Sequence, residues 1–210
     1  MGQEHVAGKP RLTLVGQEPN PGDDAALIAA LLAGERRAAA ALFDRYAPFV
    51  RTLLRRQLGP AAEVDDLTQE VFLRLFPRVS RLRDPGALRA FVTAFTVRVA
   101  RTELTSRWVR RWLRLSPRGE TPEVVAPGSD FEARETVARL YRVLDELSPQ
   151  ARTLFVLRYI EGLENQDIAS AAGISLATVK RHLTRVCKHV FARMGKDPQV
   201  MAYLQRGDGT

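Results

Sequence analysis

Residues 166–183 decide the fold, and they read Gln166-Asp167-Ile168-Ala169-Ser170-Ala171-Ala172-Gly173-Ile174-Ser175-Leu176-Ala177-Thr178-Val179-Lys180-Arg181-His182-Leu183. The pattern predicts a short helix, a tight turn at Gly173 and a second helix that Ser175 caps. Ile174 is expected to pack into the core between the two helices, and Val179 and Leu183 are expected to hold the second helix against that core. This anatomy is that of a helix-turn-helix.

The outward face of the second helix is basic and polar. Between Ile174 and Lys196 there are six Lys or Arg residues and no acid. Such a face is suited to binding the phosphate backbone of a nucleic acid. The alternative is that these side chains form a basic helix surface that contacts only solvent. Because the glycine, the cap and the charge agree, we expect DNA recognition, with Arg181 and Thr184 on bases and Lys188 on the backbone. The predicted DNA-binding set of this helix is Ser175, Thr178, Lys180, Arg181, Thr184, Arg185 and Lys188.

Upstream of this motif the sequence predicts more helices and no β-strand. Apolar residues recur at three- and four-residue spacing in two helices within residues 25–54 and in a third within residues 64–75. Pro77 should end or kink the third helix. Asp84, directly before a proline, predicts the start of a helix that runs to about Leu113.

A composition change divides the chain into two halves. Residues 115–130 are rich in Pro, Gly and Ser, and when extended they could span at most about 53 Å at about 3.3 Å per residue. We therefore predict an all-α protein with two small helical domains that fold independently, joined by a flexible linker. The predicted divisions are a disordered leader (1–22), a first domain (23–114), the linker (115–130), a second domain with the helix-turn-helix (131–196) and a C-terminal tail (197–210).

Composition narrows the function classes. The net charge is +8, with 32 basic residues, which indicates a polyanionic partner. Cys187 is the only cysteine, so an intramolecular disulfide and a Cys-rich zinc site are excluded, as fits a reducing cytosol. The N-terminus does not resemble a signal peptide and no run of about 18 apolar residues occurs, so a cytoplasmic protein is expected.

A second basic run ends the first domain. Seven arginines lie within residues 98–118, with Glu103 as the only acid and with Trp108 and Trp112 interleaved. Aromatic rings among arginines suit unpaired nucleic-acid bases. Two interpretations of the tryptophans remain open, base stacking and contact with a core or the linker.

An acidic cluster stands out in this basic chain. It comprises Glu63, Asp65, Asp66 and Glu70, on a helix whose other side is apolar. Carboxylates in the first turn of a helix are favourable for the helix itself, and this alone could explain Asp65 and Asp66.

Signals for catalysis are weak. His5, His182 and His189 lie in the leader or on the basic helix, and Cys187 is expected to be a packing thiol. No Gly-rich phosphate loop or metal-ligand spacing occurs. The sequence therefore predicts a protein that is not an enzyme, with no catalytic residues, no metal and no cofactor.

The order of these features resembles an extracytoplasmic-function (group IV) sigma factor of the bacterial sigma-70 family, over about residues 24–194. The stretch Asp65-Asp66-Leu67-Thr68-Gln69-Glu70-Val71-Phe72-Leu73-Arg74-Leu75 is similar to the segment D-L-x-Q-E-x-F that docks on the β′ clamp of RNA polymerase. Residues 147–163 and 178–180 are similar to region four, which reads the minus-35 promoter element.

The resemblance implies a factor that binds the polymerase core at the β′ clamp and the β flap and directs promoter-specific initiation. Promoter DNA and an anti-sigma factor are further implied partners, and no membrane is involved. The loop of residues 79–87 would capture a flipped minus-10 base, and the linker would thread through the polymerase cleft. The implied core-binding residues are Asp65, Asp66, Leu67, Gln69, Glu70, Phe72 and Arg74. The implied minus-10 residues are Arg81, Arg83, Arg98, Arg101, Arg107, Trp108 and Arg111.

The chain departs from the family at several places. Phe91 stands where a Trp is common, and Arg98 and Thr102 align with a frequent Asn and Asp. Pro77 replaces a helix former, and His182 a frequent Arg. The main alternative is a helix-turn-helix regulator that does not bind core polymerase as a sigma factor. A nucleic-acid enzyme is a third class, which would need carboxylates or metal ligands that converge on one point.

Overall fold

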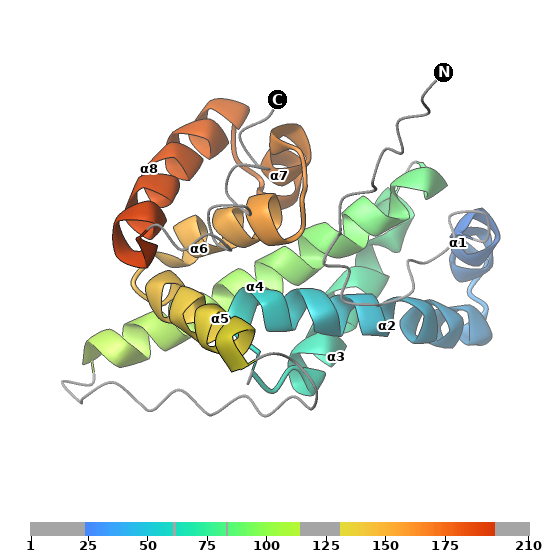
Figure 1. The fold of residues 1–210 in the computed structure, drawn as a ribbon. Helices are drawn as coiled ribbons and strands as arrows, with labels where there is room; N and C mark the ends of the chain where they lie inside the picture. The colour runs from blue at the N-terminus through green and yellow to red at the C-terminus, as the bar shows by residue number, and fades with distance from the viewer. Residues whose placement is uncertain (1–23, 61, 83, 114–130, 196–210) are drawn as a thin grey trace, which may run out of the picture.

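All the regular structure in the described residues is helical. The computed structural model describes residues 24–60, 62–82, 84–113 and 131–195 (Figure 1). The elements are α1 (Asp24–Leu32), α2 (Arg36–Leu58), α3 (Asp65–Leu75), the 3-10 turns η2 (Phe76–Arg81) and η3 (Pro85–Ala87), α4 (Leu88–Leu113), α5 (Phe131–Leu144), α6 (Pro149–Phe155), the π-helical turn η4 (Val156–Ile160), α7 (Asn165–Ala172) and α8 (Leu176–Met194). The all-α prediction is confirmed. The predicted leader, linker and tail lie outside the described residues.

The first domain packs α1 to α4 around one apolar core. Leu42, Val50 and Val92 lie at its centre, fully buried. As predicted, α3 ends before Pro77, which lies in the first turn of η2. The carboxylate of Asp84 accepts a hydrogen bond from the Gly86 N–H at 2.9 Å and so caps η3 directly before α4. The predicted loop of residues 79–87 is thus largely two tight 3-10 turns.

The second domain contains the predicted helix-turn-helix. Gly173 has φ +68° between α7 and α8, a left-handed conformation that favours glycine. The Ser175 hydroxyl accepts the Thr178 N–H at 3.2 Å and caps α8. Ile174 packs against the buried cluster around Val179.

A π-helical turn in the second domain was not anticipated. The N–H of Glu161 donates to the Val156 carbonyl at 2.9 Å, which closes a wider turn than an α-helix has. Val156 packs with the α5–α8 core, whereas Leu157 packs with the α7 side. Two consecutive side chains are thus buried in two different clusters at the wider turn. Regular helical spacing of apolar residues does not predict such a turn.

The two domains share an apolar cluster. Leu53 of α2 and Val97 of α4 are buried together with Leu154, Leu157 and Ile168 of the second domain. In Figure 1, α4 runs along α6 and α7. The sequence predicted halves that fold independently. It gave no sign of this contact at Leu53, which satisfies the helical spacing of the first domain's own core, and although Val97 lies off the inward face that Leu88, Val92, Phe95 and Val99 mark, nothing in the sequence names its partner.

Candidate functional site

The acidic face of α3 is only partly neutralised within the chain. Asp65 accepts a hydrogen bond from Arg51 Nε at 2.8 Å, and Glu70 pairs with Arg74 one turn further along the helix. Asp66 and Gln69 are exposed, and neither forms a hydrogen bond or ion pair with any part of the chain that the structure describes. These two side chains are therefore available to a partner.

An apolar groove lies beside this face. It is lined by Phe43, Gln69, Phe72, Leu73 and Phe76. The Phe72 ring lies 4.7 Å from the Phe43 ring and 5.8 Å from the Phe76 ring, measured between centroids. Leu73 is 67% exposed, so its apolar side chain lies open to solvent beside the groove.

Phe72 has a different place from the one the resemblance implies. It is only 2% exposed, because it packs between Phe43 and Phe76 in the first-domain core. Its side chain forms the floor of the groove. The exposed apolar side chain on this face is instead that of Leu73. The family segment does not single out this position, and its exposure became visible only in the structure.

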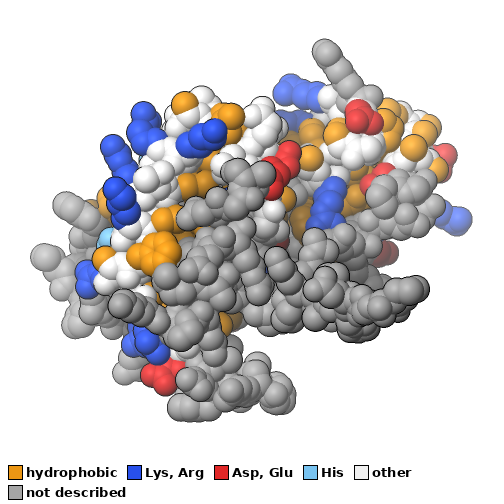
Figure 2. Space-filling model, turned by 45° about the horizontal axis from the view of Figure 1, so that its top comes forward, with side chains coloured by type: hydrophobic (Ala, Val, Ile, Leu, Met, Phe, Trp, Pro, Cys, Tyr) orange, Lys and Arg blue, Asp and Glu red, His pale blue; other side chains and the backbone are white. Residues whose placement is uncertain are grey.

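The basic face of α8 is open to solvent. Figure 2 shows Lys and Arg side chains following one another along the side of the molecule that α8 forms. The exposed members of the predicted set are Ser175, Lys180, Arg181, Thr184, Arg185 and Lys188, and Thr178 is half-buried.

Three members of this set, Ser175, Thr178 and Thr184, already have hydrogen-bond partners in the chain. The oxygens of Ser175 and Thr178 lie 2.8 Å apart, so both belong to the cap of α8. The Thr184 hydroxyl donates to the Lys180 carbonyl at 3.0 Å, which leaves its oxygen lone pairs and its methyl group to face outward.

The predicted minus-10 residues fall into two groups. Arg81 and Arg98 are exposed on the first domain, and the Arg98 guanidinium lies 5.3 Å from the centre of the Phe95 ring. Arg101 instead donates to the Ala172 carbonyl of α7 at 3.3 Å, and Arg107 is paired with Glu103 at 2.7 Å. Arg83 lies outside the described residues.

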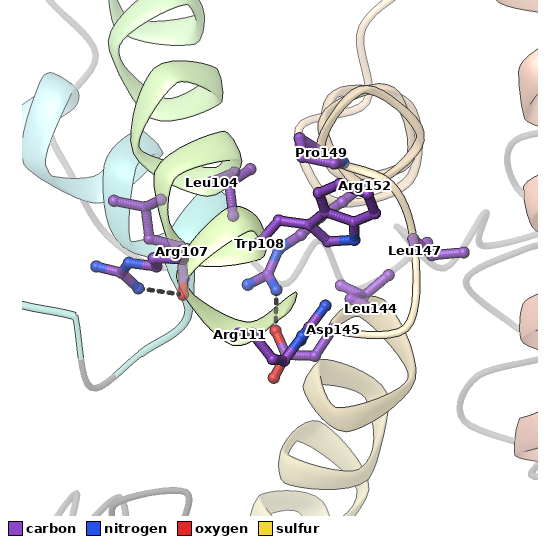
Figure 3. A pocket seen from close by; sticks show the side chains of 10 residues that line it. Leu104, Arg107, Trp108, Arg111, Leu144, Asp145, Leu147, Pro149 and Arg152 are labelled. Carbon is purple, nitrogen blue, oxygen red and sulfur yellow. Dashed lines mark hydrogen bonds and ion pairs between the residues drawn. The ribbon is translucent and has the colours of Figure 1, made fainter. Parts of the chain in front are cut away.

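Trp108 and Arg111 line a crevice between the domains, opposite Asp145, Leu147 and Pro149 (Figure 3). Trp108 is 37% exposed there. Of its two interpretations, the structure supports contact with a core, in this case the edge of the second domain. The side chain of Trp112 is not among those that the structure describes.

A buried arginine stands at the centre of this crevice. Arg152 is 4% exposed, its Nε donates to the Gln57 carbonyl at 2.7 Å, and its other end forms an ion pair with Asp145. Burial lowers the pKa of the Arg152 guanidinium, and the negative charge of Asp145 opposes that shift. Sequence reasoning gave Arg152 no role at a contact between the domains, because its partner Gln57 lies 95 positions away and no local pattern indicates the pairing.

Tyr141 lies beside Arg152. Its hydroxyl donates to the Arg56 carbonyl of α2 at 2.9 Å. Burial raises the pKa of Tyr141 to about 12, so the phenol remains a protonated donor well into the alkaline range.

Cys187 and His189 of α8 have structural partners. The Cys187 sulfur lies 2.7 Å from the Tyr159 hydroxyl, and His189 lies 3.2 Å from Glu146. In the described ranges, no group of three or more His, Cys, Asp or Glu residues is placed to hold a metal ion. None of the described helices combines the length and the apolarity that a membrane-spanning helix requires.

Comparison with known proteins gives the family. The family model for sigma-70 region 2 matches residues 42–111, and the model for sigma-70 region 4 matches residues 138–190. The chain is 29% identical over 154 residues to the ferric citrate uptake sigma factor FecI of Escherichia coli K12, a match that covers 70% of this chain and 86% of FecI. It is 31% identical over 144 residues to the RNA polymerase sigma-E factor of Streptomyces coelicolor, covering 66% of this chain and 78% of that protein.

A solved structure has a similar fold. It is CnrH in complex with the cytosolic domain of CnrY, with a TM-score of 0.55 and 22% identity over 83% of this chain and 99% of CnrH. A helix-turn-helix regulator would not account for the region 2 match, which includes α3 and its groove. The chain therefore belongs to the extracytoplasmic-function group of the sigma-70 family, and it is a sigma factor that directs RNA polymerase in transcription initiation.

Proposed function

We propose that this sigma factor docks on the polymerase core through the face formed by α3 and the neighbouring aromatic groove. The observation that carries the proposal is the combination of exposed Asp66 and Gln69, which have no partner among the described residues, with the exposed side chain of Leu73. An apolar anchor beside polar groups is the usual make-up of a protein–protein interface. In a chain of net charge +8, an acidic face is also poorly suited to DNA.

In this proposal the docked factor reads DNA with both domains. Arg181 and Thr184 of α8 contact bases of the minus-35 element, and Lys188 contacts the backbone. Their exposure on one helix face supports this assignment. Arg81 and Arg98, exposed on the first domain, contact the melted minus-10 region.

The factor would act without performing chemistry itself. It would make the core promoter-specific and stabilise unpaired bases. Partners of the whole protein would be the β′ clamp, the β flap and promoter DNA. An anti-sigma protein is proposed as a further partner because the chain resembles CnrH, whose structure was solved with the cytosolic domain of CnrY.

The docking assignment is tested with the double variant Asp66→Arg, Gln69→Ala. It places a positive charge on the acidic face and removes the adjacent amide, at positions without partners in the described part of the chain. The matched control is Glu35→Arg, which makes the same charge change at the start of α2, where the Glu35 side chain forms no cap hydrogen bond. The measurement is the affinity of each chain for bacterial core polymerase.

We expect the double variant to bind core more weakly, with helical content unchanged, and the control to bind as the unaltered chain does. Equal core affinity for all three chains would contradict the assignment of α3 as the docking face. A loss shared by the control would show that net charge, rather than this face, governs binding.

A further inference from the structure

The hydroxyl groups at the start of α8 are engaged within the helix itself. The Ser175 hydroxyl accepts the Thr178 N–H at 3.2 Å, and the hydroxyl oxygens of Ser175 and Thr178 lie 2.8 Å apart. One of these two hydroxyls donates its proton to the other. Both therefore belong to the cap, which limits the hydrogen bonds that they can offer to the edge of a base.

The neighbouring surface of the same turn is apolar. Leu176, the first residue of α8, is 36% exposed, and Ala177 beside it is exposed as well. On the other side of the cap, Ile174 packs in the buried cluster around Val179 and so fixes the start of the helix against the core. Part of the Leu176 side chain thus remains available to a partner outside the chain.

Leu176 heads the row of side chains that the proposed function places on DNA. Residues four positions apart follow one another along one ridge of a helix, so Leu176, Lys180, Thr184 and Lys188 share a ridge. The last three are exposed. In a helix-turn-helix the N-terminal residues of the second helix are the ones that reach base edges in the major groove. A docking that brings Lys180 and Thr184 into the groove therefore brings Leu176 with them.

Only one base carries an apolar substituent on its major-groove edge. Guanine, cytosine and adenine present hydrogen-bond donors or acceptors there, whereas thymine also presents its C5 methyl group. A leucine side chain forms no hydrogen bond, and covering a polar group without a hydrogen bond costs free energy. An aliphatic side chain at this point of the groove therefore favours thymine over the other three bases.

We infer that Leu176 is a specificity-determining residue that packs against the C5 methyl group of a thymine in the minus-35 element. The inference rests on the proposed function, in which α8 reads this element, and it adds the chemical identity of one base. Leu176 and Arg181 are five positions apart in α8. At about 1.5 Å per residue this is about 7.5 Å, so the thymine lies about two base pairs from the base that Arg181 contacts.

The test uses holoenzyme formed from the full chain and bacterial core polymerase. The DNA is a promoter fragment from which this holoenzyme transcribes selectively. Each thymine of its minus-35 element, on either strand, is replaced singly by deoxyuridine, which lacks the C5 methyl group and keeps the pairing edge. The affinity for each fragment is measured with the unaltered chain, with Leu176→Ala and with the matched control Val137→Ala, which shortens a side chain of α5 that is 46% exposed.

The expected result is a coupling between one methyl group and one side chain. Burial of a methyl group corresponds to about fourfold in affinity, so one uracil substitution should weaken binding by about this factor in the unaltered chain and in Val137→Ala. In Leu176→Ala the same substitution should change the affinity by less than about twofold, because the shorter side chain leaves the methyl group uncovered. Leu176→Met, which restores an apolar side chain of similar reach, should restore the sensitivity.

Two results would overturn the inference although α8 still reads the element. One is a minus-35 element in which no uracil substitution weakens binding, or which contains no thymine. The other is a sensitive position that stays equally sensitive in Leu176→Ala, which would assign the methyl group to another side chain or to the shape of the DNA. If the holoenzyme bound a fragment with a scrambled minus-35 element as tightly as the unaltered fragment, the reading of this element by α8 would itself be wrong, and the role of Leu176 would fall with it.

Discussion

Leu73→Ala is the sharpest perturbation of the proposed docking face. The leucine lines the groove beside Phe72 and is 67% exposed, so most of its apolar surface remains to be buried by a partner. Full burial of such a side chain contributes about 1.5–3 kcal/mol, so the exposed part corresponds to about 1–2 kcal/mol. At about 1.4 kcal/mol per factor of ten, its loss should weaken core binding by roughly 5- to 30-fold.

The substitution should spare the fold. Alanine is the best helix former, and an exposed leucine contributes little to the core of the free protein. The matched control is Leu32→Ala on α1, which removes a leucine that is 55% exposed and lies outside the groove. Core affinity is measured by titration of fluorescently labelled chain with polymerase core, and unfolding by urea checks stability.

The reasoning predicts a loss for Leu73→Ala and none for Leu32→Ala. If both variants bind core as tightly as the unaltered chain, Leu73 stays exposed in the complex and the groove is not the docking site. Equal losses in both would mean that α1 belongs to the interface as well.

Further predictions concern the cap of α8, its DNA-reading face and the buried Tyr141. Ser175→Ala should lower the free energy of unfolding by about 0.5–2 kcal/mol and Ser175→Gly by only a few tenths, measured by urea unfolding; a loss of promoter binding without loss of stability would instead make Ser175 a DNA contact. Arg181→Ala should remove about 1–3 kcal/mol of preference for the cognate minus-35 sequence over a scrambled one in holoenzyme binding, and equal losses on both DNAs would assign Arg181 to the backbone. Lys188→Ala should weaken binding to both DNAs alike and reduce the salt slope by about 1, whereas a sequence-dependent loss would contradict its backbone role. Burial raises the pKa of Tyr141 to about 12, so the free energy of unfolding should fall as pH rises from about 10 through about 12; the phenolate absorbance of Tyr141, taken as the difference from Tyr141→Phe, should appear near pH 12, and appearance near pH 10 would contradict the burial.

Local signals in the sequence predicted most of the fold. Pro77, Asp84, Gly173 and Ser175 mark element boundaries because each acts within a few residues of itself, through a fixed φ, a left-handed turn or a cap. Apolar spacing then identified the buried faces of most helices. The π-helical turn of η4 was not predicted, because it depends on the packing of neighbouring side chains into two separate apolar clusters.

The sequence predicted which helices carry the charged faces of the site, but it did not predict which of their side chains are exposed. Charge patterns located the α3 and α8 faces, but exposure distinguishes Leu73 from buried Phe72, and exposure depends on packing against Phe43 and Phe76 from other elements. The contact between the domains was beyond sequence reasoning. Arg152, at its centre, bonds to a residue 95 positions away in the chain, and no local pattern encodes such a pairing.

The measurement that tests the account most directly is transcription by bacterial core polymerase on a collection of promoter fragments, with the full chain as the only added factor. The account predicts transcripts with defined start points from a subset of the fragments, and their loss when Asp66→Arg, Gln69→Ala replaces the unaltered chain. Transcription that is the same with and without the chain would contradict its role as a sigma factor. Selective transcription that the double variant fully retains would contradict docking through α3.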